Sequence, residues 1–195
     1  ENIWKAEKKE ILLSGIGEKL AEKIITEKNS INPDEEFEKL QKENIGLIIF
    51  TDQRYPKLLR EIPNPPYILY TKGEFDPNAA PMVSIVGSRK YTSYGAQVAT
   101  SLARDMARAG ITVVSGMAIG IDTFSHRGAL DGKGKTIAVL GNGLDDKNIY
   151  PKVNFNLSKN ISQNGMLLSE YPVGTSAGPL TFPARNRIIA GMSLG

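Results

Sequence analysis

The chain of 195 residues has no cysteine and only one histidine, His126. The lack of cysteine excludes disulfide bonds, thiol catalysis and cysteine-ligated zinc, and it is typical of proteins of the cytoplasm. A lone histidine argues against a histidine-based metal site or proton relay. We therefore expect a cytoplasmic protein that holds no metal ion and no cofactor.

Long apolar runs are also missing. No stretch approaches the roughly 18 consecutive apolar residues of a membrane-spanning helix. The first residues, Glu1-Asn2-Ile3-Trp4-Lys5, lack the basic-then-apolar pattern of a signal peptide. We expect no membrane segment.

Two common nucleotide-binding motifs are absent as well. No Gly-x-Gly-x-x-Gly follows the first strand of the expected α/β region, and no complete Gly-x-x-x-x-Gly-Lys-Ser/Thr motif occurs. These motifs place pyrophosphate or triphosphate groups on a glycine-rich turn. Their absence disfavours a dinucleotide-dependent enzyme and an ATPase.

Charge is unevenly distributed along the chain. Residues 1–45 hold 8 Lys/Arg against 11 Asp/Glu, a net charge of −3, and residues 46–195 hold 16 against 10, a net charge of +6. A basic body suits a polyanionic partner such as nucleic acid, whereas the acidic N-terminal part does not. The alternative is an ordinary fluctuation of surface charge.

Residues 1–45 are predicted to form a small helical domain. Around Leu13-Ser14-Gly15-Ile16-Gly17, a hydrophobe and a Gly-x-Gly precede apolar residues at helical spacing, which is typical of a helix-hairpin-helix (SAM-like) element. In such an element the turn presents backbone N–H groups to a nucleic-acid phosphate. The alternative is a tight corner between two packed helices, and the local charge of −3 favours a protein partner over DNA.

Residues 46–195 are predicted to form an α/β domain. An extension over 46–81 is expected to contain a short buried strand, 46–50, and a second strand, 67–71. From residue 82 on, strands and helices alternate, with strands over 82–86, 111–115, 136–140 and 166–169 and helices over 94–109, 121–130, 154–164 and 185–190. This pattern predicts a Rossmann-like, doubly wound, mostly parallel sheet with helices on both faces. A further strand is expected where the sequence ends, so the C-terminal part of this domain is expected to be missing.

In such a sheet, the loops after the parallel strands meet at one edge, where ligands bind. The four loops here are Gly87-Ser88-Arg89, 116–122, 141–145 and 170–187. Glycines let a backbone approach a ligand closely, and arginine binds phosphate as a planar fork. Phe182, three residues before Arg185, adds a ring on which a base could stack. The alternatives are a surface ion pair for Arg89 and a core anchor for Phe182.

Asp122 and His126 lie four residues apart at the start of a predicted helix, beside Ser125. A hydrolytic relay would need the serine to face the histidine, but adjacent helical residues point to different faces. We expect Asp122 to cap the helix and His126 to satisfy a neighbouring loop, and we expect no catalytic residue.

Five motifs follow one another along the α/β region. They are Val86–Arg89 (VGSR), 115–130 (SGMAIGID, then HRGAL), 136–145 (TIAVLGNGLD), 168–172 (LSEYP) and 182–191 (FPARNRIIAG). Each is weak alone, but in this order they resemble the DprA (Smf) family of DNA-processing proteins. The resemblance covers the chain from about residue 46 to its end.

The resemblance implies a Rossmann-like domain that binds single-stranded DNA, forms a homodimer and loads the recombinase RecA onto the strand in natural transformation and recombination. The residues that it implies for DNA binding are Gly87, Ser88, Arg89, Gly116, Gly120, Phe182, Arg185, Asn186 and Arg187, with Asp122 and His126 as loop support.

Within that set the resemblance implies separate roles. Arg89 would hold a backbone phosphate with the amides of the two preceding residues, and Phe182 would stack on a base. Arg185 and Asn186 would complete the pocket. The chain departs from the family at Ile119, where the glycine-rich loop usually carries an arginine, so one basic contact is expected to be absent.

Two other functions remain open on the residues alone. One is a nucleotide-processing Rossmann enzyme that hydrolyses nucleoside monophosphates. It would use the same first-loop phosphate site and a carboxylate at the mouth, for which Asp122, Asp145 and Glu170 are candidates. The other is a structural adaptor built on residues 1–45.

Overall fold

The computed structural model describes residues 2–195, with side chains from residue 4 onward. Contacts divide the chain into two units, Glu1–Gln41 and Lys42–Gly195, close to the boundary expected after residue 45. Helices supply the first unit: α1 Asn2–Lys5, α2 Lys8–Leu13, α3 Glu18–Ser30 and most of α4 Pro33–Lys42.

The first unit contains the glycine corner expected from the sequence. Gly15 lies between α2 and α3 with φ 86°, in the left-handed region that favours glycine. Gly17 is the residue before α3, and its carbonyl accepts the N–H groups of Leu20 and Ala21. This helix–turn–helix geometry suits both the helix-hairpin-helix interpretation and the packed-corner interpretation.

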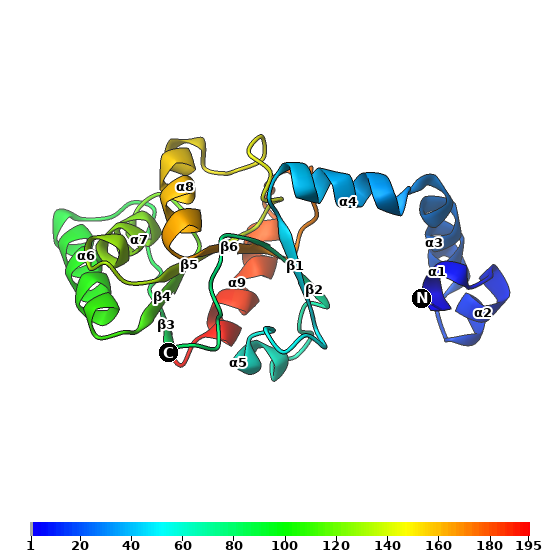
Figure 1. The fold of residues 1–195 in the computed structure, drawn as a ribbon, viewed down its shortest axis with the longest axis horizontal. Helices are drawn as coiled ribbons and strands as arrows, with labels where there is room; N and C mark the ends of the chain where they lie inside the picture. Colours follow the sequence, from blue (N-terminus) through cyan, green and yellow to red (C-terminus); the bar gives the residue numbers. More distant parts are fainter. Residues whose placement is uncertain (1) are drawn as a thin grey trace. The chain divides into compact units, whose positions relative to one another are not determined.

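The second unit is built on a six-stranded mixed sheet in the order β1-β2-β6-β5-β4-β3 (Figure 1). The strands are β1 Gly46–Ile49, β2 Ile68–Lys72, β3 Met82–Ser84, β4 Thr112–Ser115, β5 Thr136–Leu140 and β6 Met166–Ser169. The last four run parallel to one another, and β2 pairs antiparallel with both β6 and β1. The predicted mostly parallel sheet is confirmed, and the extension over 46–81 widens it by a hairpin beyond β6.

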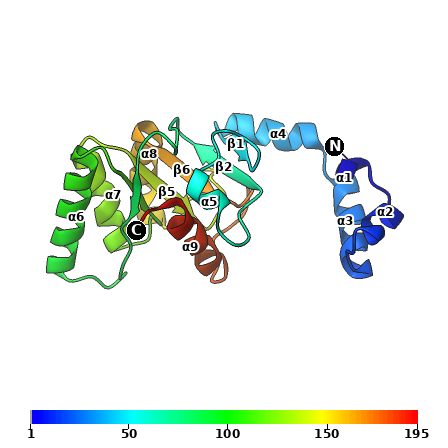
Figure 2. The ribbon, with the colours of Figure 1, turned by 90° about the horizontal axis from the view of Figure 1, so that it is seen from below.

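Helices cover both faces of this sheet. The helices α6 Ser93–Arg108, α7 Ile121–Asp131 and α8 Phe155–Asn164 lie on one face, and α9 Thr181–Met192 and the short α5 Lys57–Arg60 lie on the other (Figures 1 and 2). Alternate strand residues supply the two cores: Val114 packs in the cluster with α9, and Val113 packs in the cluster with α6 and α7. Apolar burial on both faces thus fixes the sheet between two helical layers.

Two elements differ from their prediction. The first strand, β1, is an edge strand with one neighbour, so only Ile48 of its residues is buried. Helix α9 begins at Thr181 rather than at residue 185, because Pro183 fits the first turn, where its missing N–H costs nothing. Phe182 therefore lies on a helix and not on a loop.

The other edge of the sheet is bordered by the last residues of the sequence. The N–H of Leu194 donates to Met82 O, and the N–H of Ser84 donates to Gly195 O. These residues therefore lie beside β3. Among the described residues, no helix is long and apolar enough to cross a membrane.

Candidate functional site

A groove lies at the carboxyl ends of the parallel strands, between the first two loops and α9. Its volume is about 500 Å³, and an adjoining narrower hollow shares Arg89, Ala118, Phe182 and Arg185 with it. Six of the nine residues expected to bind DNA line these two hollows, namely Gly87, Arg89, Gly116, Phe182, Arg185 and Asn186, and Asp122 lines the groove as well. The strand order therefore brings residues 98 positions apart in the sequence, such as Gly87 and Arg185, to one edge.

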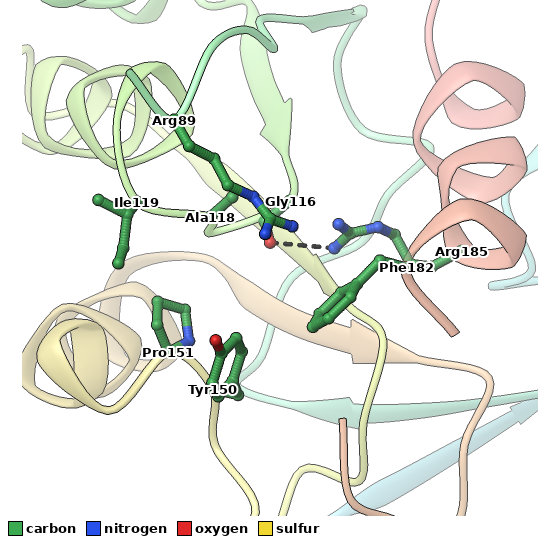
Figure 3. A pocket seen from close by; sticks show the side chains of 8 residues that line it. All are labelled: Arg89, Gly116, Ala118, Ile119, Tyr150, Pro151, Phe182 and Arg185. Atoms are coloured by element: carbon green, nitrogen blue, oxygen red, sulfur yellow. Dashed lines mark hydrogen bonds between the residues drawn. The ribbon is translucent and has the colours of Figure 1, made fainter. Parts of the chain in front are cut away.

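Arg89 is the exposed cation of the groove. Its guanidinium carbon lies 5.4 Å from the centroid of the Phe182 ring, and Figure 3 shows the side chain extending from the first loop toward α9. In the part of the chain that the structure describes, this guanidinium has no hydrogen bond and no ion pair. It is therefore available to an anionic ligand.

The first two loops are held against each other by close backbone contacts. Gly120 has φ 97°, and a Cβ atom there would lie 2.3 Å from Ser88 O. The N–H of Ile121 donates to the same oxygen over 3.3 Å. Gly120 is buried, so its effect on the site is to let the second loop support the Ser88–Arg89 backbone.

Asp122 ties the same two loops together through its buried carboxylate. It accepts the N–H groups of Gly116 at 3.2 Å, Ala118 at 3.3 Å and Gly87 at 3.4 Å. Burial raises the pKa of this carboxyl, and the three N–H groups offset part of that rise. The expected helix cap is wrong, because Gly120 precedes α7 and Asp122 points back to the loops. The Gly87 N–H is likewise occupied and not free for a phosphate.

Arg185 is buried, and two of its three guanidinium nitrogens donate hydrogen bonds to described residues. Its side chain is 4% exposed, and its Nη1 donates to Gly116 O at 2.9 Å and to Val139 O, while its Nε donates to Asn186 Oδ1 at 3.2 Å. Figure 3 shows the bond to Gly116 and the remaining nitrogen, Nη2, on the side of Arg89. Burial lowers the pKa of the guanidinium, and the Asp122 charge opposes that change. Through these hydrogen bonds, Arg185 links α9 to the end of β4 and to β5.

Arg187 lies outside the groove. Its Nη2 bonds Glu170 Oε1, its Nε donates to Asn64 O at 3.3 Å and its Nη1 donates to Ala184 O at 3.2 Å. The resemblance implies DNA binding for Arg187 as well, but the structure does not bring it into the groove with Arg185, because residues two apart on a helix point in different directions.

His126 is fully buried and hydrogen-bonded to a strand rather than to a loop. Its Nδ1 lies 2.7 Å from Thr136 Oγ1, and that hydroxyl donates to Val113 O at 2.7 Å. Because the Thr136 hydroxyl donates its hydrogen to Val113 O, it can only accept a hydrogen bond from His126. The imidazole proton is therefore on Nδ1, which donates a hydrogen bond to Thr136 Oγ1. Burial, with the Arg185 charge, lowers the pKa of His126 to about 3. The imidazole is therefore neutral and structural.

The buried imidazole predicts a loss of stability in mild acid. An unfolded chain binds a proton at His126 below about pH 6.5, whereas the folded chain does so only near the pKa of about 3. The free energy of unfolding should therefore fall from pH 6.5 downward by about 1.4 kcal/mol per pH unit. Urea unfolding at pH 7.0 and 5.5 measures it.

The matched control for this pH effect is the His126→Asn variant, which keeps a side-chain N–H near Thr136 and cannot titrate. It should lose the part of the slope that begins at pH 6.5. In addition, the sequence has one histidine, so a single imidazole NMR signal reports on it. A signal that titrates between pH 6 and 7 in the folded protein would contradict a neutral, buried His126.

The carboxylates that an enzyme would need are engaged in the structure. Asp145 is buried and accepts N–H groups from Gly174 and Asn148, and Glu170 is paired with Arg187. No group of three possible metal ligands (His, Cys, Asp or Glu) occurs among the described residues. Two of the three candidate carboxylates, Asp145 and Glu170, are thus held in hydrogen bonds or an ion pair.

Residues 191–195, Gly-Met-Ser-Leu-Gly, also match the Gly-x-Ser-x-Gly pattern of serine hydrolases. In those enzymes the serine sits on a strand-to-helix turn and contacts a histidine. Here Ser193 follows the end of α9, and its hydroxyl donates a hydrogen bond to Ile189 O at 3.1 Å and accepts one from the Ser84 hydroxyl at 2.7 Å. Its geometry is that of a helix end and not of a nucleophile.

Sequence reasoning did not point to Tyr150 and Pro151, which line the narrower hollow. Tyr150 is 46% exposed, and its ring centroid lies 5.7 Å from that of Phe182. The only signal in the sequence was an aromatic residue five positions beyond Asp145, where the predicted third loop ended.

Comparison with known proteins assigns the chain to a family. The model of the family described as DNA recombination-mediator protein A matches residues 46–195. The chain belongs to this family. It is 44% identical to Protein Smf of Synechocystis over 99% of this chain and 49% of that protein. It is 38% identical to DNA processing protein DprA of Bacillus subtilis over 80% of this chain and 52% of that protein.

Solved structures of the family share the fold. The DprA structure from Streptococcus pneumoniae matches with a TM-score of 0.77 and 36% identity over 89% of this chain and 59% of that chain. DprA from Helicobacter pylori, for which a single-stranded DNA binding mode is described, matches with a TM-score of 0.68 and 33% identity over 76% and 66%. The resemblance to DprA and Smf is confirmed, and the chain spans about half the length of the curated relatives named here.

Proposed function

We propose that the second unit binds single-stranded DNA with little sequence preference, without catalysing a reaction. The observation that carries this proposal is that the exposed Arg89, which makes no hydrogen bond or ion pair with the described residues, lies beside the Phe182 ring in the groove. A cation beside a ring is suited to one nucleotide, because the cation binds its phosphate and the ring stacks on its base.

The backbone around Arg89 adds to the phosphate site. The Ser88 N–H has no acceptor among the described residues, and Arg185 Nη2 lies on the Arg89 side of the groove (Figure 3). Asp122, Gly120 and the remaining Arg185 nitrogens hold the two loops in place, so little ordering is needed when a strand binds. The net charge of +6 over residues 46–195 favours a polyanion.

Relatives support the choice of a single strand. The Helicobacter pylori relative binds single-stranded DNA, and it shares the fold of this chain. The partly exposed ring of Phe182 also favours unpaired bases, because bases inside a duplex are already stacked on each other.

Fluorescence anisotropy with a labelled oligonucleotide and its duplex tests the proposal. We expect the single strand to bind more tightly than the duplex at about 50 mM and at about 200 mM salt. The affinity for the single strand should fall steeply as the salt concentration rises. Release of free base from nucleoside monophosphates would favour the hydrolase instead. Equal affinity for both forms, or no binding at low salt, would overturn the proposal.

Changing Phe182 to alanine should weaken single-strand binding by about 1–2 kcal/mol. This lies toward the low end of the usual 1–3 kcal/mol per stacked base, because Tyr150 and Arg89 already contact the ring. The Phe182→Tyr variant keeps a ring and should bind nearly as tightly as the original chain. If Phe182→Ala lowers the melting temperature and leaves affinity unchanged, the ring is a core anchor.

The family resemblance extends the proposal to a cytoplasmic homodimer that loads RecA onto the bound strand. Sedimentation of the chain and its binding to purified RecA on an oligonucleotide test these two partners. We also propose that the helical first unit contacts either DNA or a protein through its glycine corner. A chain that starts at Lys42 lacks this unit and distinguishes the two possibilities. Lower DNA affinity of that chain would indicate a DNA contact, and weaker self-association or RecA binding would indicate a protein contact.

A further inference from the structure

We infer that Tyr150 is a second base-stacking residue, which holds the nucleotide next to the one on Phe182. This inference rests on the proposed single-strand function and adds a contact to it. Tyr150 comes from the segment between β5 and α8, whereas Phe182 comes from α9, so two separate elements bring the rings together (Figure 3).

The Tyr150 ring is exposed although its neighbours are buried. It is 46% exposed, whereas Ile149 is 1% exposed and Pro151 is buried. Its hydroxyl has no hydrogen bond to any residue that the structure describes. A half-exposed ring with an unused hydroxyl contributes little to the fold itself, and it offers a face to a ligand.

The segment that carries Tyr150 is fixed to the glycine-rich second loop. Asn154 donates from Nδ2 to Met117 O at 2.9 Å and to Thr123 Oγ1 at 2.8 Å, and its N–H bonds Pro151 O at 2.9 Å. The position of the ring at the rim is therefore set by a buried hydrogen-bond network. Ile119 and Pro151 line the same hollow as the ring, together with Arg89 and Arg185 (Figure 3).

The spacing of the two rings indicates adjacent bases and not one sandwiched base. Their centroids are 5.7 Å apart and their planes are inclined by 40°. Each stacked pair alone needs about 4.5–7 Å between ring centroids, so a base cannot fit between rings this close. We therefore assign a separate base to each ring, with the Arg89 guanidinium, 5.4 Å from the Phe182 centroid, available to a phosphate of the same strand.

The chain contains a matched ring pair outside the groove. Tyr67 is 81% exposed, and its ring lies 5.8 Å from the Phe50 ring with planes inclined by 38°. Tyr67 does not line either hollow of the groove. Tyr67→Ala thus removes an exposed ring of the same geometry without changing the site.

The experiment compares an intact oligonucleotide with a fully abasic strand of the same length and charge. For Tyr150→Ala we expect binding to the intact strand to weaken about tenfold, within the range known for one stacked base, and binding to the abasic strand to stay within about twofold. Tyr150→Phe should keep nearly full affinity, because the ring and not the hydroxyl binds. Tyr67→Ala should change neither strand.

A double-variant cycle separates direct stacking from support of Phe182. If Tyr150 binds its own base, Tyr150→Ala should still weaken intact-strand binding about tenfold in the Phe182→Ala background. If it only positions the Phe182 ring, that effect disappears there, and the inference is overturned. An equal loss on intact and abasic strands, or no loss on either, overturns it as well. Failure of the original chain to bind any single strand would instead refute the proposed function.

Discussion

Changing Arg89 to alanine should weaken single-strand binding by about 10- to 100-fold. The variant removes the exposed guanidinium of the groove, and hydrogen bonds to charged groups contribute roughly 1.5–3 kcal/mol. It should also lower the slope of log affinity against log salt by about 0.7 for each phosphate that is no longer neutralised. Anisotropy titrations at several salt concentrations measure both effects. Because Arg89 makes no hydrogen bond or ion pair with the described residues, the free energy of unfolding should change little.

Arg108→Ala is the matched control for this prediction. Arg108 is exposed, carries the same charge and lies at the end of α6, where its nearest acidic partner is Asp105 at 4.0 Å. It lines neither hollow of the groove. Its removal should leave the affinity within about twofold and the salt slope unchanged. Equal effects of the two variants would show that Arg89 contributes only net charge, and the phosphate assignment would then be wrong.

The fold of the second unit could be predicted because its signals are local. Short apolar strands followed by glycine-rich loops and helices recur from residue 82, and such alternation has few solutions besides a parallel sheet. The same rule predicted that Gly87 and Arg185 meet, since the carboxyl ends of parallel strands share one edge. The antiparallel hairpin of β1 and β2 gave no such signal, because its position beside β6 depends on pairing far along the sequence.

The sequence could not distinguish the free arginine from the buried one. Arg89 and Arg185 both belong to short motifs at the carboxyl edge of the sheet. Arg185, however, lies on the face of α9 that packs into the core. Arg185, Ile188, Ile189 and Met192 follow the i, i+3, i+4, i+7 spacing of one buried helix face. The predicted helix began at Arg185 and ended at residue 190, so this pattern was not recognised.

Asp122 shows a second limit of the same kind. A carboxylate in the first turn of a helix is usually explained by the helix itself, through capping or the helix dipole. Here the carboxylate accepts N–H groups of two loops, which precede Asp122 by up to 35 residues. Only the packing of the first two parallel strands against each other brings those groups together, so no local pattern could reveal this role.

Changing Arg185 to leucine should destabilise the second unit by about 3–5 kcal/mol. The variant removes the donor that Arg185 supplies to the carbonyls of Gly116 and Val139, and it removes the positive charge that favours the ionised form of buried Asp122. Removing one partner from a buried charged network has this magnitude because the remaining groups cannot regain water. Urea unfolding, monitored by circular dichroism, measures the destabilisation. An unchanged slope of the free energy of unfolding against urea concentration would show that the unfolded state is unaffected.

The neighbouring Arg187→Ala variant provides the control for Arg185. Arg187 is partly exposed and is paired with Glu170 at the surface, so its removal should cost less than about 1 kcal/mol. Arg185→Lys should recover only part of the stability, because an ammonium group cannot reproduce the planar set of donors that reaches Gly116, Val139 and Asn186 together. If Arg185→Leu kept full stability and weakened DNA affinity alone, Arg185 would be a ligand-binding residue like Arg89. If the stability falls as expected, Arg185 is the residue that holds the two loops and α9 in the geometry that Arg89 needs.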